Sequence, residues 1–471
     1  MEKDRISDLP DGILHKIVSL LPMRDAIRTA ALSGKCRQLG KFIPNLNFES
    51  DNIVGRSFSI DRFNELDNDG QVEFLLNRKL KFVGAVDKFF QLRPCAIKME
   101  SLRIYSSLDT EHTTYLDQWI RVASSSNIES LDLTLREDDF YHLDEEKYYS
   151  FPFHLLPNKV LCLSSLKCLS LESLIMRPHP DFYGFKSLTT LFLRDVNISD
   201  VDLGNIFFTS SLLESLRLWA CVSLVHLEIP SSCSRLKYLD LSNCRLECVS
   251  INAPNVKTFV YKGNLISFSF VKVPQIDHIE FTFMGDCYEW INYVFNKVPQ
   301  LVPQLESLRL FCGNHIEAES IQYYFPQFTK LKQLTVTHFS SSHHDLLWMI
   351  PLLRACPSLE EFHLDLIPEC EDHSRYMGEV AKLYPRCPLK RLKTVEISGF
   401  NGFWCQIDLA SRLLSNADAL ETMTIDCRDK FQQEDGTYEI YGYYNGIKRC
   451  RRRIRRFVTK RVPQSAKLVV L

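Results

Sequence analysis

Residues 213–241 read LESLRLWACVSLVHLEIPSSCSRLKYLDL and contain one spacing of apolar residues three times. The spacing is an apolar residue, two free positions, an apolar residue, one free position and a third apolar residue. Its three copies are Leu213-Leu216-Leu218, Leu224-Leu227-Ile229 and Leu236-Leu239-Leu241. The last two apolar positions of each copy are two residues apart, so in a strand both side chains point to the same face. Each copy therefore predicts one short strand with one buried face.

The same spacing recurs along most of the chain, at intervals of 20 to 38 residues. The first apolar positions of these copies are Met99, Ile128, Leu166, Leu188, Leu213, Leu236, Val256, Ile276, Leu305, Leu331, Leu359, Leu392 and Leu420. A single strand cannot cover its own apolar face, so successive copies have to stack into a parallel sheet. The recurrence predicts leucine-rich repeats, an α/β fold built as a curved and irregular solenoid.

Between residues 213 and 276 the interval shortens, and additional copies begin halfway through each repeat, at Leu224, Leu246 and Leu265. About ten residues are too few for a helix with two turns, so we expect the return segments there to be strands. The longer repeats leave room for helices. Helical apolar spacing occurs in residues 286–298, 344–356 and 407–417, which we expect to be helices.

The composition is that of an ordered chain, with 45% hydrophobic and 24% charged residues among 471. The net charge of −2 excludes a chain-wide attraction to nucleic acid or to an anionic membrane. The 16 cysteines include no CxxC pair, so we expect reduced thiols in the cytoplasm or nucleus. No stretch reaches the roughly 18 apolar residues of a membrane span, and the charged N-terminus does not resemble a signal peptide, so we expect no membrane partner.

Residues 4–40 read DRISDLPDGILHKIVSLLPMRDAIRTAALSGKCRQLG and follow a helical pattern instead. Asp8 is a good N-cap, and Pro22 ends the first helix. One face of that helix carries Leu9, Ile13, Ile17 and Leu21 at every fourth position. A unit of about 40 residues cannot bury all of its apolar surface by itself, so another protein is expected to cover it.

The segments DRISDLPDGIL, LLP and IRTAALS resemble the F-box motif of plant F-box proteins. The resemblance implies a three-helix F-box over residues 1–45, which binds a Skp-type adaptor and through it a cullin–RING ubiquitin ligase. The positions that form or flank the adaptor contact in the family correspond to Leu9, Pro10, Ile13, Leu14, Ile17, Leu20, Leu21 and Pro22. The chain departs from the usual plant pattern at Gly12, Gly34, Cys36 and Gly40, and the last two replace tryptophans.

An F-box followed by leucine-rich repeats is a combination that this family uses widely. Residues 388–471, with LKTVEISGFNG, LETMTIDC and VPQSAKLVVL, resemble the FBD-type tail of many plant members. We therefore expect a helical connector over residues 46–98, the repeat solenoid over 99–387 and an FBD-like cap over 388–471.

The run KRCRRRIRRFVTKR, residues 448–461, is the strongest charge feature of the chain. One interpretation is a nuclear-localisation signal or a nucleic-acid patch. The other is the solvated face of a helix that packs Ile447, Cys450, Ile454, Phe457 and Val458 inward. The helical spacing favours the second interpretation, and the sequence thus argues against a nucleic-acid partner.

Catalytic chemistry is not indicated, because no GxGxxG, GxxxxGK[ST], GxSxG or HExxH motif and no metal-ligand spacing occurs. We expect no catalytic residue, metal or cofactor. A target protein should bind the concave strand face, where aromatic and arginine side chains anchor interfaces. The candidates are Phe192, Arg194, Arg217, Trp219, Arg309 and Phe311.

The resemblance thus implies a non-enzymatic substrate-recognition subunit of an SCF-type (Skp–cullin–F-box) ubiquitin ligase. The alternative is a leucine-rich-repeat scaffold whose degenerate F-box is not coupled to a ligase. Recognition of a small molecule also stays open, and the sequence does not name the target or its degradation signal.

Overall fold

The computed structural model describes residues 10, 13, 43–55, 66–93, 98–136, 145–155, 163–179, 182, 185–285, 287–312, 325–340, 346–368, 388–432, 438–441 and 447–471. Most of the predicted F-box lies outside these residues. The chain forms two compact units. The first comprises residues 1–236 and 243–247, and the second comprises residues 237–242 and 248–471.

The first unit is built on a parallel sheet with the strand order β1-β2-β3-β5-β6-β7. These strands are β1 (Asn45–Glu49), β2 (Ser101–Tyr105), β3 (Ser130–Thr134), β5 (Cys168–Ile175), β6 (Thr190–Asn197) and β7 (Ser215–Trp219). The two-residue strand β4 (Tyr149–Ser150) pairs with the end of β5, and β8 (His226–Ile229) follows β7. Consecutive parallel neighbours are the topology that stacked repeats require.

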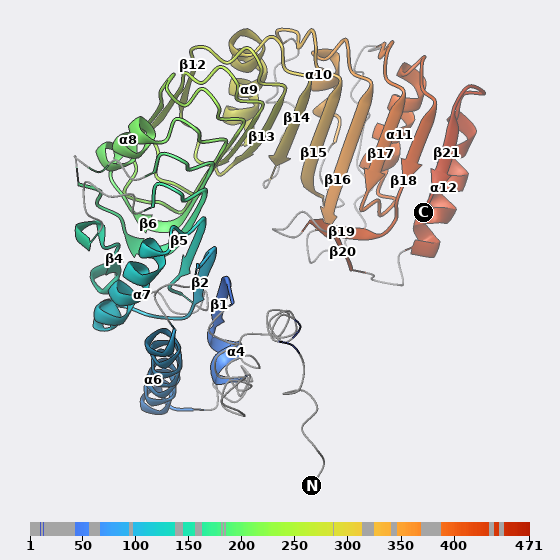
Figure 1. Cartoon of the computed structure of the whole chain (residues 1–471). Coiled ribbons are helices and arrows are strands. Elements are labelled where there is room, and N and C mark those ends of the chain that lie inside the picture. Colours follow the sequence, from blue (N-terminus) through green and yellow to red (C-terminus); the bar gives the residue numbers. More distant parts are fainter. Residues whose placement is uncertain are drawn as a thin grey trace. The chain divides into compact units, whose positions relative to one another are not determined.

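The helices of the first unit lie in the connections between these strands (Figure 1). They are α4 (Ser50–Val54), α6 (Asn68–Leu92), α7 (Thr113–Ser125) and α8 (Asp200–Thr209), with short 3-10 turns η2 (Thr110–His112), η3 (Glu145–Lys147) and η4 (Phe153–Leu155). The longest, α6, is held against the first repeats, because the Phe90 ring stacks on Trp119 with centroids 6.0 Å apart. At its C-terminal end, Arg93 Nη1 donates to the Ile43 carbonyl at 2.9 Å.

The second unit continues the same plan with the strand order β9-β11-β13-β14-β15-β16-β17-β18-β21. Its sheet strands are β9 (Tyr238–Ser242), β11 (Thr258–Gly263), β13 (His278–Phe283), β14 (Ser307–Cys312), β15 (Gln333–Ser340), β16 (Glu361–Pro368), β17 (Thr394–Ser398), β18 (Thr422–Ile425) and β21 (Lys467–Val470). Two smaller pairings accompany them, β10 (Cys248–Ile251) with β12 (Ser267–Phe270) and β19 (Asp429–Gln432) with β20 (Tyr438–Tyr441). Its helices are α9 (Cys287–Leu301), α10 (Met349–Arg354), α11 (Trp404–Asn416) and α12 (Ile447–Phe457), and η6 (Thr459–Arg461) follows α12.

The apolar positions of the repeat form two continuous rows in the core of each unit. In the first unit, one row aligns Leu102, Leu131, Leu169, Leu191 and Leu216 strand by strand, and all of them are buried. Full burial of one such side chain contributes about 1.5–3 kcal/mol. Because the register repeats from strand to strand, the buried face is continuous, as the α/β leucine-rich-repeat prediction requires.

The return segments also agree with the prediction. The copies beginning at Leu224, Leu246 and Leu265 form the strands β8, β10 and β12. In the second unit, the Phe268 ring of β12 meets Phe259 of the sheet at a centroid distance of 5.8 Å, so this return strand shares a core with the sheet. The predicted helices over residues 286–298, 344–356 and 407–417 correspond to α9, α10 and α11.

The sheet starts one strand earlier than Met99, where the repeats were expected to begin. Strand β1, inside the region assigned to the F-box and the helical connector, pairs in parallel with β2. Its Leu46 and Phe48 are buried, because they occupy the last two positions of another copy of the spacing, which begins at Ile43. The connector region therefore contains both the long helix α6 and the first sheet strand.

Four successive repeats have a residue with a left-handed backbone conformation two positions after the last apolar residue of the strand. Ser173, Asp195, Ala220 and Asn243 have φ angles of 57°, 53°, 52° and 56°. Each lies two residues after the last apolar position of its copy. This conformation is disfavoured for residues with a Cβ, so its recurrence indicates that the stacking of the repeats sets the turn after these four strands.

Candidate functional site

The predicted adaptor-binding residues lie almost entirely outside the described residues. Of the eight, only Pro10 and Ile13 are described, and both are exposed. The Ile13 amide donates to the Pro10 carbonyl at 3.0 Å, and half of the Ile13 surface is accessible. Leu9, Leu14, Ile17, Leu20, Leu21 and Pro22 stay predictions.

Four of the six predicted target-binding residues come together on the face of the sheet opposite its buried rows. Phe192 and Arg194 of β6 stand beside Arg217 and Trp219 of β7, because the strands pair Phe192 with Arg217 and Arg194 with Trp219. The Phe192 ring meets Trp219 edge to face, with centroids 5.8 Å apart. The Arg194 guanidinium carbon lies 5.6 Å from the Trp219 ring centroid, within the range of a cation–π contact. We call these four residues the β6–β7 cluster.

An acidic side chain on the preceding strand completes this cluster. Glu172 of β5 pairs with Arg194 in the sheet register, and its Oε1 lies 3.6 Å from Arg194 Nε. Burial raises the pKa of Glu172, while the positive charge of Arg194 opposes this shift. Arg194 is therefore oriented from both sides, by the Glu172 carboxylate and by the Trp219 ring, whereas the Arg217 side chain is exposed.

The two remaining candidates, Arg309 and Phe311, lie on β14 in the second unit. Arg309 Nε is 3.8 Å from Glu280 Oε2 on β13, and burial raises the pKa of Glu280 against the effect of Arg309. Phe311 meets Phe339 of β15 at a centroid distance of 5.7 Å. Strand β14 therefore carries the same residue types as the β6–β7 cluster, an arginine near a carboxylate and an aromatic ring in contact with a second ring.

Sequence reasoning missed other polar groups on the same sheet face. Arg103 of β2 lies between Glu49 and Asp132, at 3.7 Å and 3.3 Å. In the second unit, His363 lies 3.6 Å from Glu361 and 3.7 Å from Glu396. These residues occupy free positions of the repeat or, in the case of Glu49, the position directly after its last apolar residue, so the alternation of the strand places them on this face. Which charges meet depends on the strand register, which the spacing alone does not give.

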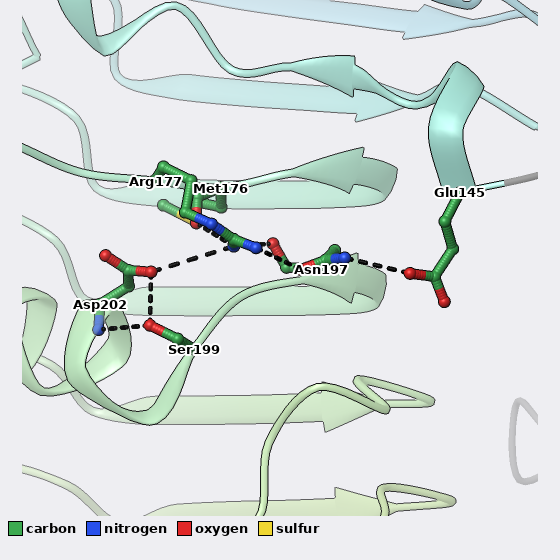
Figure 2. Close-up of polar contacts among 6 residues, drawn as sticks. All are labelled: Glu145, Met176, Arg177, Asn197, Ser199 and Asp202. Atoms are coloured by element: carbon green, nitrogen blue, oxygen red, sulfur yellow. Dashed lines mark hydrogen bonds and ion pairs between the residues drawn. The ribbon is translucent and has the colours of Figure 1, made fainter.

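A polar network fixes the start of the connection between β6 and β7, which contains α8 (Figure 2). Arg177 Nη1 donates to the Asn197 carbonyl at 2.7 Å, and Arg177 Nη2 donates to Asn197 Oδ1 at 2.5 Å. Asn197 Nδ2 in turn donates to Glu145 Oε2 at 3.0 Å. Asp202 in the first turn of α8 lies 3.9 Å from Arg177 and accepts from the N-cap Ser199 hydroxyl at 2.5 Å. The ends of β5 and β6 and the start of α8 are thus tied together.

A second network holds the residue directly after Arg194. The Asp195 carboxylate accepts from the Tyr148 hydroxyl at 2.6 Å and from the Ser173 hydroxyl at 2.9 Å. Arg136 Nη1 lies 3.7 Å from the same carboxylate. These contacts stabilise the left-handed conformation of Asp195. They also fix the backbone directly after Arg194 of the β6–β7 cluster, and a fixed backbone is what a preorganised binding surface requires.

The described residues offer no sign of a metal centre or of a membrane span. Across the described segments, no group of three or more His, Cys, Asp or Glu side chains could hold a metal ion. Among the same segments, no helix is both long and apolar enough to cross a bilayer. Ten of the cysteines in the described part of the chain are free thiols.

Comparison with known proteins places these observations in a family context. Residues 93–471 match the family model described as At1g61320/AtMIF1, LRR domain. The Arabidopsis thaliana F-box/FBD/LRR-repeat protein At5g53840 is 23% identical, and the match covers 95% of this chain and 94% of that protein. The Arabidopsis FBD-associated F-box protein At5g60610 is 24% identical over 90% of this chain and 99% of its own length.

Solved structures with some similarity are also leucine-rich-repeat proteins. One is a leucine-rich-repeat protein of Leptospira interrogans, 12% identical, with coverage of 81% of this chain and 91% of that one and a TM-score of 0.26. Another is the ectodomain of the Arabidopsis receptor kinase GASSHO1/SCHENGEN3, 16% identical, with coverage of 72% and 40% and a TM-score of 0.26.

Proposed function

This chain belongs to the plant F-box/leucine-rich-repeat proteins, and from this premise we propose that it is the substrate-recognition subunit of an SCF-type ubiquitin ligase. In this proposal the F-box binds a Skp-type adaptor in the cytoplasm or nucleus, and the repeats bind a target protein. The cullin–RING ligase attached to the adaptor then transfers ubiquitin. The chain itself acts without catalysis, because it raises the local concentration of target at the ligase.

The observation that carries this proposal is the extent of the match to proteins named for their F-box. A match covering 95% of the chain leaves only about 24 of 471 residues uncovered. It therefore includes part of residues 1–45, where the F-box motif is read. The names of these relatives include an F-box and an FBD region, and this supports the proposal that residues 1–45 and 388–471 of this chain are such regions.

The β6–β7 cluster supports a protein target. Trp, Tyr and Arg side chains supply most of the binding energy at protein interfaces. Here Trp219 and Phe192 already touch each other, and Arg194 is already oriented by Glu172. A partner would lose little side-chain freedom at this surface on binding, because the anchors are held in place beforehand.

The attachment of the long helix α6 to the repeats supports a proposal in which one chain binds both the adaptor and the target. Helix α6 follows the F-box in the chain, and the Phe90–Trp119 stack and the Arg93–Ile43 hydrogen bond attach it to the first repeats. A ligase subunit that presents a target needs the segment after its F-box to be held firmly on the repeats, because a loose segment would spread the target over a larger volume.

The test is the substitution Ile17→Asp, which introduces a carboxylate in the middle of the predicted adaptor-binding helix face. An unpaired charge in a dry interface costs more than the roughly 1.5–3 kcal/mol of the lost Ile side chain. We expect adaptor affinity to fall at least about a hundredfold, or about 2.7 kcal/mol. The measurement is titration of a purified Skp-type adaptor against the full-length protein, with circular dichroism to monitor folding.

The matched control is Val201→Asp, which places the same charge on an apolar residue of α8 that is 74% exposed. This control should bind the adaptor like the wild type. If the wild type itself binds no Skp-type adaptor, the scaffold alternative replaces the ligase proposal. If Ile17→Asp binds as well as the wild type, the adaptor docks on another surface.

A further inference from the structure

Helix α12 carries a dense row of positive charge in the second unit. Its sequence IKRCRRRIRRF contains no acidic residue, and η6 adds two more cations. The exposed cations of both elements are Lys448, Arg449, Arg451, Arg452, Arg455, Arg456, Lys460 and Arg461, which we call the α12 basic face. Among the described residues, none of the eight forms an ion pair with a carboxylate. This density stands out in a chain whose net charge is −2.

The opposite side of α12 is already used for packing. Cys450, Ile454 and Val458 are buried, as the helical interpretation of the sequence predicts. Arg453 Nη1 donates to the Gly402 carbonyl at 2.7 Å and so ties α12 to the start of α11. The helix cannot place its apolar side in a bilayer while it is packed in this way. The cations are therefore presented on a preformed surface.

An exposed aromatic ring borders the same surface. Trp404, the first residue of α11, is 48% exposed. Its ring meets Phe457 of α12 at a centroid distance of 4.8 Å. The Arg456 guanidinium carbon in turn lies 5.0 Å from the centroid of the Phe457 ring. A flat apolar ring and a row of guanidinium groups thus lie side by side.

We propose that the α12 basic face and Trp404 together form a binding site for single-stranded nucleic acid. Arginine forks bind phosphate oxygens in pairs, and every base can stack on an exposed aromatic ring whatever its identity. The carboxylates of an acidic peptide would use the guanidinium groups but would leave the exposed ring of Trp404 without a stacking partner, whereas each nucleotide brings a phosphate and a base together. The net charge of the chain argues against such a partner only for the chain as a whole, whereas this positive charge is concentrated on one helix.

The experiment measures the fluorescence anisotropy of a labelled 20-nucleotide oligo-uridine on titration with the full-length protein, at several salt concentrations. The triple variant Arg449→Ala, Arg452→Ala and Arg456→Ala should weaken binding at least about tenfold at low salt. Each phosphate contact contributes about 0.7 to the slope of log affinity against log salt for a single strand, so the slope should fall by about 2. Alanine keeps the helix intact, because its helix propensity is the highest.

A matched control removes three positive charges elsewhere. Lys167, Lys332 and Lys393 are exposed, and each forms a 2.8 Å ion pair with a glutamate of a neighbouring repeat. Their joint replacement by alanine changes the net charge by the same amount, and we expect oligonucleotide binding to stay within about twofold of the wild type. An equal loss in both triple variants would show an effect of overall charge and would overturn the site.

The ring is tested separately. Trp404→Leu should weaken oligonucleotide binding about tenfold without changing the salt slope, and Trp404→Phe should restore most of it, because stacking needs a ring. Polyglutamate and vesicles with anionic lipid are titrated in parallel. Binding of polyglutamate with no effect of Trp404→Leu would assign the face to an acidic protein segment. Binding of vesicles alone, or of none of the three probes, would also reject the proposal.

Discussion

Lys79 of α6 and Asp109, the residue before η2, form a buried ion pair with Nζ and Oδ2 2.7 Å apart. The other carboxylate oxygen of Asp109 lies 2.8 Å from His112 Nδ1. The pair joins the connector helix to the first repeat across 30 positions of sequence. Both side chains are largely buried. A single substitution that removes one of the two charges should therefore lower the stability of the protein strongly.

We expect Asp109→Asn to destabilise the protein by about 3 kcal/mol, since removal of one partner leaves the other charge buried without compensation. Denaturant unfolding followed by near-ultraviolet circular dichroism measures the difference. Glu100→Gln serves as control, because its ion pair with Lys98 is largely exposed and such pairs contribute at most about 1 kcal/mol. Equal losses of unfolding free energy in the two variants would show that the buried Lys79–Asp109 pair contributes no more to stability than an exposed pair.

The same carboxylate predicts a pH dependence. Burial alone would raise the pKa of Asp109, but hydrogen bonds from His112 and Lys79 outweigh it and hold this pKa well below its usual range. The folded pKa then lies below the unfolded value of about 3.9, so the stabilisation is present above about pH 4 and is lost as the pH falls further. The stability difference between wild type and Asp109→Asn should therefore shrink from pH 7 to pH 3. A difference that is constant over this range would contradict the assignment.

Gly399 should not tolerate a side chain. Its φ angle is +65°, and an added Cβ would lie 1.8 Å from the backbone carbonyl oxygen of Leu366 on the neighbouring strand. Gly399→Ala should cost at least about 3 kcal/mol, because the backbone of two repeats has to move. Gly204→Ala is the control, since Gly204 lies in α8 with no atom within 4 Å of its added Cβ. That substitution should stabilise by up to about 1 kcal/mol. Thermal unfolding of both variants gives the comparison.

Target capture should depend on the β6–β7 cluster. The double substitution Arg217→Ala and Trp219→Ala should reduce captured target at least about tenfold, with adaptor binding unchanged. Stability should fall by about 1 kcal/mol or less, since Arg217 is exposed and Trp219 only half-buried. The measurement compares proteins copurified with wild-type and variant chains by quantitative mass spectrometry.

The control for this experiment is Val201→Ala with Phe208→Ala on α8, where the two side chains are 74% and 77% exposed. This pair removes comparable apolar surface from the helical side of the same unit, and target capture should persist. A large loss of stability in the Arg217/Trp219 variant would instead mean that these residues belong to the core.

The repeat fold could be predicted from the sequence because every copy contains the same local signal. The two apolar positions of a copy are enough to place a strand and its buried face, and the short interval near Leu246 was enough to predict a strand in the return segment. The copy at Ile43-Leu46-Phe48 has the same signal. Its place in the series cannot be recognised from the sequence, because α6 separates it from Met99 by far more than the usual interval.

Contacts between side chains of different repeats could not be predicted in this way. The pairing of Glu172 with Arg194 needs the strand register, and the pairing of Lys79 with Asp109 needs the placement of a helix against a turn. The spacing predicted that Phe192, Arg194, Arg217 and Trp219 share one face. It did not reveal that Arg194 lies between a carboxylate and an indole ring.

The two rows of buried side chains also bear on how such proteins diverge. The side chain between the last two apolar positions of each strand points to the face opposite both rows, so many substitutions there disturb the buried rows little and can accumulate as neutral drift or under selection. Relatives that share only 23–24% of their residues with this chain still match it almost from end to end. A gene duplicate of such a protein can thus change its binding partner while it keeps its inherited framework.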